Sequence, residues 1–120
     1  MSDPTATRVA DALRRATEQR DAELLINLYA DDAELRVVDR NRMPSSPLVL
    51  RGKETLAEFF KDVCGRDMIH RIEQQVIGDN RLAFLEACEY PDGCHVLCAS
   101  VVELRAGKIL RQVNVQAWDE

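Results

Sequence analysis

Residues 20–37 change from helical to strand periodicity within a few positions, which limits the chain to folds that mix both element types. Asp21 is placed to cap a helix whose apolar residues continue at helical spacing to Tyr29. The Ala-Asp-Asp-Ala sequence at 30–33 ends that helix, and residues 34–38 alternate between polar and apolar as a half-buried strand does. We therefore predict a helix that turns abruptly into a strand.

The rest of the chain divides into helical segments followed by strand-like ones. Asp3 as N-cap and Pro4 at the first helical position predict the start of a helix whose apolar stripe runs over 9–16. Apolar residues at helical spacing predict another helix over 56–64 that ends near Gly65. Residues 39–47 contain two prolines and no periodicity, which predicts a loop. Four strand-like runs separated by turn residues follow, at 69–77, 81–90, 94–105 and 108–118. We expect one α+β domain over residues 1–120, with three N-terminal helices packed on one face of a strongly curved, mainly antiparallel sheet.

Composition and charge exclude several classes of partner. Apolar residues make up 46% of the chain and charged residues 31%, with no run long enough to cross a bilayer, so we expect no membrane partner. The net charge of −5 disfavours nucleic acid, which is bound by clustered basic residues. Residues 1–5 lack the basic and apolar regions of a signal peptide, so a cytoplasmic location is expected.

The four cysteines do not have the spacing of a metal site. No Cys-x-x-Cys pair occurs, and on a strand Cys94 and Cys98 would stand about 13 Å apart, too far for one zinc ion. Cys88 and Cys94 flank a predicted hairpin turn and could pair across it, but a reducing cytoplasm favours free thiols. We expect all four, including Cys64, to be buried free thiols, with no metal and no cofactor.

The chain resembles the nuclear transport factor 2-like superfamily, and within it the SnoaL-like and ketosteroid isomerase-like proteins. The resemblance covers most of the chain and is carried by Asp21 with the 28–33 corner, the 50–54 segment, Phe59-Phe60, the 107–109 turn and Trp118-Asp119. It implies a cone-shaped barrel whose helices and bent sheet enclose an apolar pocket, often dimeric through the outer sheet face. It leaves the activity open, because this fold carries isomerases, dehydratases, cyclases, epoxide hydrolases and non-catalytic modules.

The catalytic groups of ketosteroid isomerases are not retained at the positions that the resemblance gives them. Their aspartate base falls on Val37, their tyrosine donor on Leu13, and their protonated carboxylic acid near Ser100. Two of these three positions are apolar, and the third offers a weaker donor. Steroid-type enolisation is therefore not supported.

Two titratable side chains are candidates for acid–base catalysis. Asp39 lies two residues beyond an inward strand position, so alternation could turn it toward the interior, where a desolvated carboxylate suits a general base. Otherwise it is a solvated loop residue. His70 shares a predicted strand face with Ile72, Gln74 and Val76, and is either a catalytic acid–base group or a satisfied core histidine.

The last strand carries a row of amides on one face. Gln112, Asn114 and Gln116 alternate with Val113 and Val115. The amides either face the pocket, where they could orient a ligand carbonyl or hydroxyl, or lie on the outer sheet surface or a dimer interface. The sequence leaves these two orientations equally open.

Further candidates lie on the other strands and in the predicted loop. Glu86 shares a strand face with Tyr90, and both would contact a ligand if that face is inward. The opposite face, which carries Leu85, is also apolar and could be the inward one instead. Arg40 and Arg42 either clamp an anionic substrate group or are solvated. We nominate as ligand-binding residues Tyr29, Phe59, Glu86, Tyr90, Ser100, Gln112, Asn114 and Gln116.

Two hypotheses from different classes remain. The first is a small cofactor-independent enzyme that isomerises, cyclises or dehydrates a hydrophobic small molecule by proton transfer. In it Asp39 and His70 are the acid–base groups, and Gln112 and Asn114 orient the substrate. The second is a ligand-binding or dimerisation module without chemistry. The resemblance and the apolar second face of the sheet also lead us to expect a homodimer.

Overall fold

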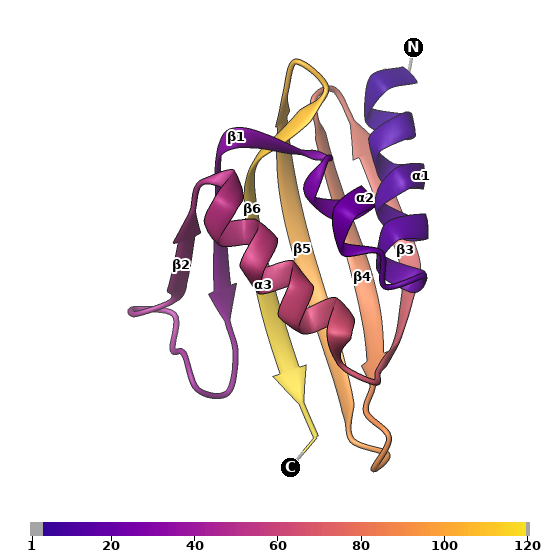
Figure 1. Cartoon of the computed structure of the whole chain (residues 1–120), viewed down its shortest axis with the longest axis vertical. Helices are drawn as coiled ribbons and strands as arrows, with labels where there is room; N and C mark the ends of the chain where they lie inside the picture. Colours follow the sequence, from indigo (N-terminus) through magenta and orange to yellow (C-terminus); the bar gives the residue numbers. More distant parts are fainter. Residues whose placement is uncertain (1–3, 120) are drawn as a thin grey trace.

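The computed structural model of the chain describes residues 4–119, in which three helices lie against one face of a curved sheet (Figure 1). The helices are α1 (Pro4–Glu18), α2 (Ala22–Ile26) and α3 (Lys53–Gly65), and the strands are β1 (Tyr29–Val38), β2 (Leu48–Arg51), β3 (Ile69–Gly78), β4 (Arg81–Glu89), β5 (His95–Arg105) and β6 (Lys108–Trp118). This confirms the predicted α+β class. The predicted N-cap, Asp3, lies outside the described residues.

One sheet contains all six described strands, in the order β2-β1-β6-β5-β4-β3. Only the β1–β6 pair is parallel, and the other neighbours are antiparallel, which confirms the mainly antiparallel sheet. The sheet is curved but not closed, since β2 and β3 form its two edges. The cone that the resemblance implies is therefore open along one side and covered there by helices.

Strands β3 to β6 form the antiparallel meander that the sequence predicts. Their hairpin turns lie at 79–80, 90–94 and 106–107, where the turn residues were found. At the last turn Gly107 has a φ of +78°, and a Cβ there would lie 3.2 Å from Cγ2 of Thr5. Glycine thus permits both the left-handed backbone and the close approach of this turn to α1.

Helix α2, which leads into β1, is shorter than predicted. Asp21 caps α2 as expected, since its Oδ1 accepts a hydrogen bond from the Leu24 amide at 3.1 Å. The helix ends after five residues, and Tyr29 already pairs with Ile109 in the sheet. The prediction that the helix continues to Tyr29 is wrong because β6 takes up these backbone groups: the Ile109 amide donates to Leu28 O at 2.7 Å.

Strand β3 contains a bulge that changes which residues face inward. Its register with β4 shifts between Ile72 and Gln74, and the Ile72 amide donates to Glu18 Oε2 on α1 at 2.9 Å. Beyond the bulge the alternation is reversed. Gln74 and Val76 are exposed, so the prediction that they share an inner face with His70 is wrong.

All four cysteines are free thiols. Cys88 and Cys98 are buried as predicted, whereas Cys64 and Cys94 are only partly buried. Cys88 lies opposite Val96 in the β4–β5 pairing, so it does not face Cys94 across the hairpin.

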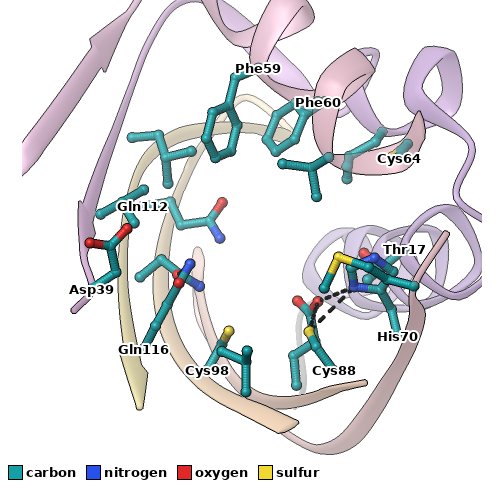
Figure 2. Close-up of a pocket in the computed structure, with 18 of the residues that line it drawn as sticks. Thr17, Asp39, Phe59, Phe60, Cys64, His70, Cys88, Cys98, Gln112 and Gln116 are labelled. Carbon is teal, nitrogen blue, oxygen red and sulfur yellow. Dashed lines mark hydrogen bonds and ion pairs between the residues drawn. The ribbon is translucent and has the colours of Figure 1, made fainter. Parts of the chain in front are cut away.

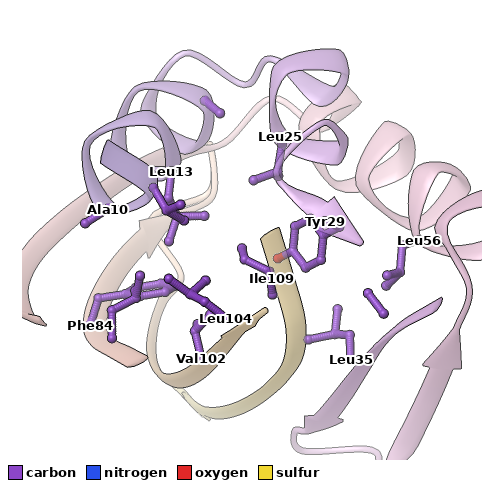
Figure 3. Close-up of a cluster of buried hydrophobic side chains, with 14 of the residues drawn as sticks. Ala10, Leu13, Leu25, Tyr29, Leu35, Leu56, Phe84, Val102, Leu104 and Ile109 are labelled. Carbon is purple, nitrogen blue, oxygen red and sulfur yellow. The ribbon is translucent and has the colours of Figure 1, made fainter. Parts of the chain in front are cut away.

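The hydrophobic core lies between the helices and the inner surface of the sheet (Figure 3). Leu13 from α1 and Leu56 from α3 meet Leu35, Val102 and Ile109 from the strands, and each of these is at most 2% exposed. This packing holds the strands that carry the polar residues described below. No helix within residues 4–119 is long and apolar enough to cross a membrane.

Candidate functional site

An open cavity of about 280 Å³ lies between α3 and the inner surface of the sheet (Figure 2). Its volume is near the lower end of the range of roughly 300–1,000 Å³ that is typical of ligand pockets. Most of its lining side chains are apolar. Of the residues nominated from the sequence, all but Ser100 line it, namely Tyr29, Asp39, Phe59, His70, Glu86, Tyr90, Gln112, Asn114 and Gln116.

The amide row of β6 faces this cavity. Gln112, Asn114 and Gln116 line it, while Val113 and Val115 lie on the outer surface with 43% and 48% exposure. Of the two orientations that the sequence left open, the structure therefore has the one in which the amides face the cavity. Hydrophobicity alone would have favoured the valines inside and the amides outside. The inward amides therefore need hydrogen-bond partners inside the protein.

A continuous hydrogen-bond network satisfies them. Trp118 Nε1 donates to Gln116 Oε1 at 3.0 Å, Gln116 Nε2 to Asn114 Oδ1 at 2.9 Å, and Asn114 Nδ2 to Ser100 Oγ at 2.7 Å. Gln112 Nε2 donates to the same Ser100 Oγ at 3.1 Å. Ser100 thus supports the row from beneath instead of lining the cavity. Each amide nitrogen uses one of its two hydrogens in this network, which leaves a second N–H for a ligand.

Tyr29 holds the inner end of the amide row. Its hydroxyl donates to Gln112 Oε1, and its ring packs against Phe60 with the centroids 5.1 Å apart. Burial raises the pKa of Tyr29 far above its ordinary value, and the negative charge of Glu86 adds to this effect. The phenol therefore stays protonated and acts as a fixed donor that positions Gln112.

A histidine, a carboxylate and a thiol meet where β3 and β4 border the cavity (Figure 2). His70 Nδ1 lies 2.9 Å from Glu86 Oε2 and 3.3 Å from Cys88 Sγ, and the Cys88 thiol donates to Glu86 Oε2 at 3.1 Å. The strand register produces this cluster, because it places His70 directly opposite Cys88. Sequence reasoning nominated His70 and Glu86 separately and missed Cys88, although Cys88 follows Glu86 by two residues on the same strand face.

The charges in this cluster are set by its hydrogen bonds. Burial by itself lowers the pKa of His70, but the hydrogen bonds with Cys88 and Glu86 and the charge of Glu86 outweigh burial and raise this pKa to about 9. At neutral pH the imidazole is therefore positively charged and donates to the carboxylate. The pKa of Cys88 is raised as well, first by its hydrogen bond with Cys98 and then by burial, so the thiol stays protonated.

Glu86 consequently has one occupied and one free carboxylate oxygen. Oε2 accepts from His70 and Cys88, whereas Oε1 has no hydrogen-bond partner among residues 4–119. Because the Glu86 side chain lines the cavity, the free oxygen is the one available to a ligand.

The same cluster is the one group of three potential metal ligands in the described part of the chain. Ligand atoms of His70, Glu86 and Cys88 lie within 4.8 Å of one another, and these are donor types that zinc accepts. To bind zinc, the imidazole and the thiol would have to lose protons, and the raised pKa of each opposes this loss. In this structure the three side chains hydrogen-bond to one another around the Glu86 carboxylate.

Asp39 lies across the cavity from His70 (Figure 2). Its Oδ1 accepts a hydrogen bond from the Asn41 amide at 2.8 Å, and its backbone pairs with Arg42. Asp39 therefore orders the start of the β1–β2 loop, as aspartates commonly do in turns. The structure does not join Asp39 and His70 as an acid–base pair; the carboxylate beside His70 is Glu86.

Hydrocarbon covers the remaining wall. Phe59 and Phe60 of α3 have their rings 5.5 Å apart and point toward the cavity (Figure 2). Leu13 and Val37, where the resemblance would place a donor and a base, also line it. The cavity thus reaches those two places but offers no polar group there.

The sequence profile of the SnoaL-like domain matches residues 9–112. The chain belongs to the SnoaL-like domain family. This confirms the resemblance drawn from the 28–33 corner, the 50–54 segment and the 107–109 turn. No sequence among the curated proteins matches the SnoaL-like chain significantly.

Solved structures with the same fold are distant in sequence. An NTF2-like protein of unknown function from Mesorhizobium loti matches at a TM-score of 0.83 and 13% identity, covering 98% of this chain and 97% of the other. A candidate ketosteroid isomerase from Kribbella flavida matches at 0.80 and 15%, covering 99% and 80%. An LEH-like epoxide hydrolase from M. tuberculosis matches at 0.73 and 16%, covering 95% and 84%. At these identities the likeness establishes the NTF2-like fold of the SnoaL-like chain and no more.

Proposed function

We propose that this SnoaL-like protein is a cofactor-independent enzyme that moves a proton within a small, largely apolar molecule, as in an isomerisation, cyclisation or dehydration. The observation that carries the proposal is the free Oε1 of Glu86, which faces the cavity while His70 and Cys88 hold Oε2. In this proposal Glu86 takes the role of proton acceptor, which the sequence had suggested for Asp39.

The amide row supplies the second half of the proposed chemistry. When Glu86 Oε1 removes a proton from a carbon next to a carbonyl, negative charge develops on the carbonyl oxygen. The spare N–H groups of Gln112 and Asn114 can donate to that oxygen, and Tyr29 and Ser100 hold these amides in place. Glu86 is a neutral carboxylic acid after this first transfer, and it then returns the proton to another atom of the substrate, which regenerates the carboxylate beside the charged His70.

The proposal is tested with 2-tetralone, an enolisable bicyclic ketone, by following its deuterium uptake from D2O by NMR. We expect the wild-type protein to accelerate the exchange, and Glu86→Gln to reduce that acceleration by about 10²–10⁴-fold, the usual contribution of one acid–base group. Asp39→Asn is the matched carboxylate-to-amide control on the opposite side of the cavity, and it is expected to keep most of the activity. If Asp39→Asn is the inactive variant, the base is Asp39 and our assignment is wrong.

A binding module without chemistry is the alternative, and one observation favours it. Leu13 and Val37 put hydrocarbon where related enzymes would hold reacting groups. A protein of this kind would bind 2-tetralone without accelerating its exchange, and Glu86→Gln would leave the affinity unchanged.

We further propose that two copies associate through the outer face of the sheet. On β5 and β6 this face exposes Leu97, Val101, Val113 and Val115 at 43–63%. Val101 and Val113 are paired neighbours, so the apolar groups form one patch. An apolar patch of this kind on a small protein commonly marks an interaction surface.

A further inference from the structure

Four side chains from four separate segments form a row at one end of the molecule, and we name Arg40, Trp118, Tyr90 and Arg66 the mouth cluster. Arg40 Cζ lies 4.2 Å from the centroid of the Trp118 ring, and Trp118 stacks on Tyr90 with the centroids 5.6 Å apart. Arg66 Nη1 donates to the Tyr90 hydroxyl at 3.1 Å. The β1–β2 loop and the adjoining ends of α3, β4 and β6 all lie at the lower end of Figure 1.

The mouth cluster borders the open end of the cavity. Trp118, Tyr90 and Arg66 are lining residues, and all four members are at least partly exposed. A molecule that occupies the cavity therefore has its outer end beside this row.

Arg40 and Arg66 differ in how their charges are balanced. Arg66 pairs with Asp62, whose Oδ2 lies 2.7 Å from Nη2. Arg40 forms no ion pair or side-chain hydrogen bond with any residue between 4 and 119, and only the Trp118 ring holds it. A guanidinium over an aromatic face keeps its in-plane N–H groups free, and these can grip a carboxylate with two parallel hydrogen bonds.

Trp118 ties the position of Arg40 to the amide row. Its indole Nε1 donates to Gln116 Oε1 at 3.0 Å, and Gln116 in turn donates to Asn114. The platform under Arg40 is thus fixed by the same network that presents amide donors to the ligand. One molecule could touch an amide deep in the cavity and Arg40 at its outer end.

We propose that the mouth cluster is a carboxylate subsite, so that the ligand is a small apolar molecule with a carbonyl or hydroxyl group inside and a carboxylate at its outer end. The proposal rests on the proposed function only in that both use the same cavity. The net charge of −5 provides no general attraction for anions. The negative charge of Asp39, at the same end of the cavity, also opposes the binding of a carboxylate. Binding of an acid here must therefore come from Arg40 itself.

The test compares 4-cyclohexylbutanoate with its primary amide, two apolar probes that differ in the charge at one end. Trp118 is the single tryptophan of the chain, so its fluorescence reports binding at the mouth, and calorimetry gives the affinity independently. We expect the acid to bind at least about tenfold more tightly than the amide, and Arg40→Gln to abolish that preference. Arg42→Gln, which removes the same charge from the same loop, should change either affinity by less than about twofold.

Three results would overturn the proposal: equal affinity for acid and amide, no binding of the acid, or equal losses in Arg40→Gln and Arg42→Gln. Neither probe has to react, so these measurements do not depend on Glu86. Glu86→Gln should keep the preference for the acid, whereas failure of the tetralone exchange would leave the carboxylate subsite untouched.

Discussion

Replacing Glu86 with glutamine should remove most of the pH dependence of stability that the structure assigns to His70. The pair is well shielded, because the side chains of His70 and Glu86 are 5% and 15% exposed. Folding raises the pKa of His70 from 6.5 to about 9. At roughly 1.36 kcal/mol per unit, this shift corresponds to about 3 kcal/mol of stability at pH values below both pKa values.

The sign follows from proton binding. The folded state holds the His70 proton more tightly than the unfolded state, so the contribution is fully present below pH 6.5 and is lost as the pH rises through 9. The raised pKa of Cys88 adds a further loss at higher pH, because unfolding would release its thiol proton. Because Glu86 also raises the pKa of Cys88, NMR titration of His70 in the wild type and in Glu86→Gln is needed to separate the histidine contribution.

Urea unfolding followed by circular dichroism between pH 6 and 10 measures this difference. We expect the wild-type free energy of unfolding to fall by about 3 kcal/mol more than that of Glu86→Gln. His95→Gln is the comparison variant, since His95 is the only other histidine and its side chain is 64% exposed, so it shows the effect of changing an exposed histidine in place of the buried one. Equal pH dependence in wild type and Glu86→Gln, or NMR titration of His70 near pH 6.5, would refute the reasoning.

Three further changes test the packing and the outer face. Tyr29→Phe removes the donor to the buried Gln112 oxygen and should cost about 1–3 kcal/mol in urea unfolding; an unchanged stability would contradict the network. Leu35→Ala empties a site that is 2% exposed and should cost about 2–5 kcal/mol, against about 0.5 for Val49→Ala at 37% exposure, and equal costs would contradict the core assignment. Val101→Lys should convert a dimer to a monomer in sedimentation, and a wild-type monomer at high concentration would contradict the dimer.

Local patterns were sufficient for the elements that depend on neighbours in sequence. The turn residues at 78–80, 91–93 and 106–107 located the meander, and the 3.6-residue period located α3 almost to its ends. The end of α2 was misplaced because Tyr29 is drawn into the sheet by β6, which follows it by about 80 residues. The local propensities of residues near Tyr29 cannot predict a pairing with so distant a strand.

Individual residues of the candidate site could be nominated from the sequence, but the contacts between them could not. Alternation along the strands made His70, Glu86 and Gln112 candidates without deciding which face of each strand is inward, and in the structure all three line the cavity. Their partners depend on register: His70 meets Glu86 because β3 and β4 pair as they do before the bulge, and Gln112 meets Tyr29 through the parallel β1–β6 pair. The role of Cys88 was missed for the same reason, because a thiol that is not part of a motif acquires its role from the strand beside it.

The most direct test of the central claim is a crystal structure of the protein with 2-tetralone bound. We predict the ketone oxygen within about 3 Å of a side-chain nitrogen of Gln112 or Asn114, and the carbon beside the carbonyl within about 3.5 Å of Glu86 Oε1. A ketone that binds outside the cavity, or whose carbonyl faces the hydrocarbon wall at Phe59 and Leu13, would contradict proton transfer at Glu86.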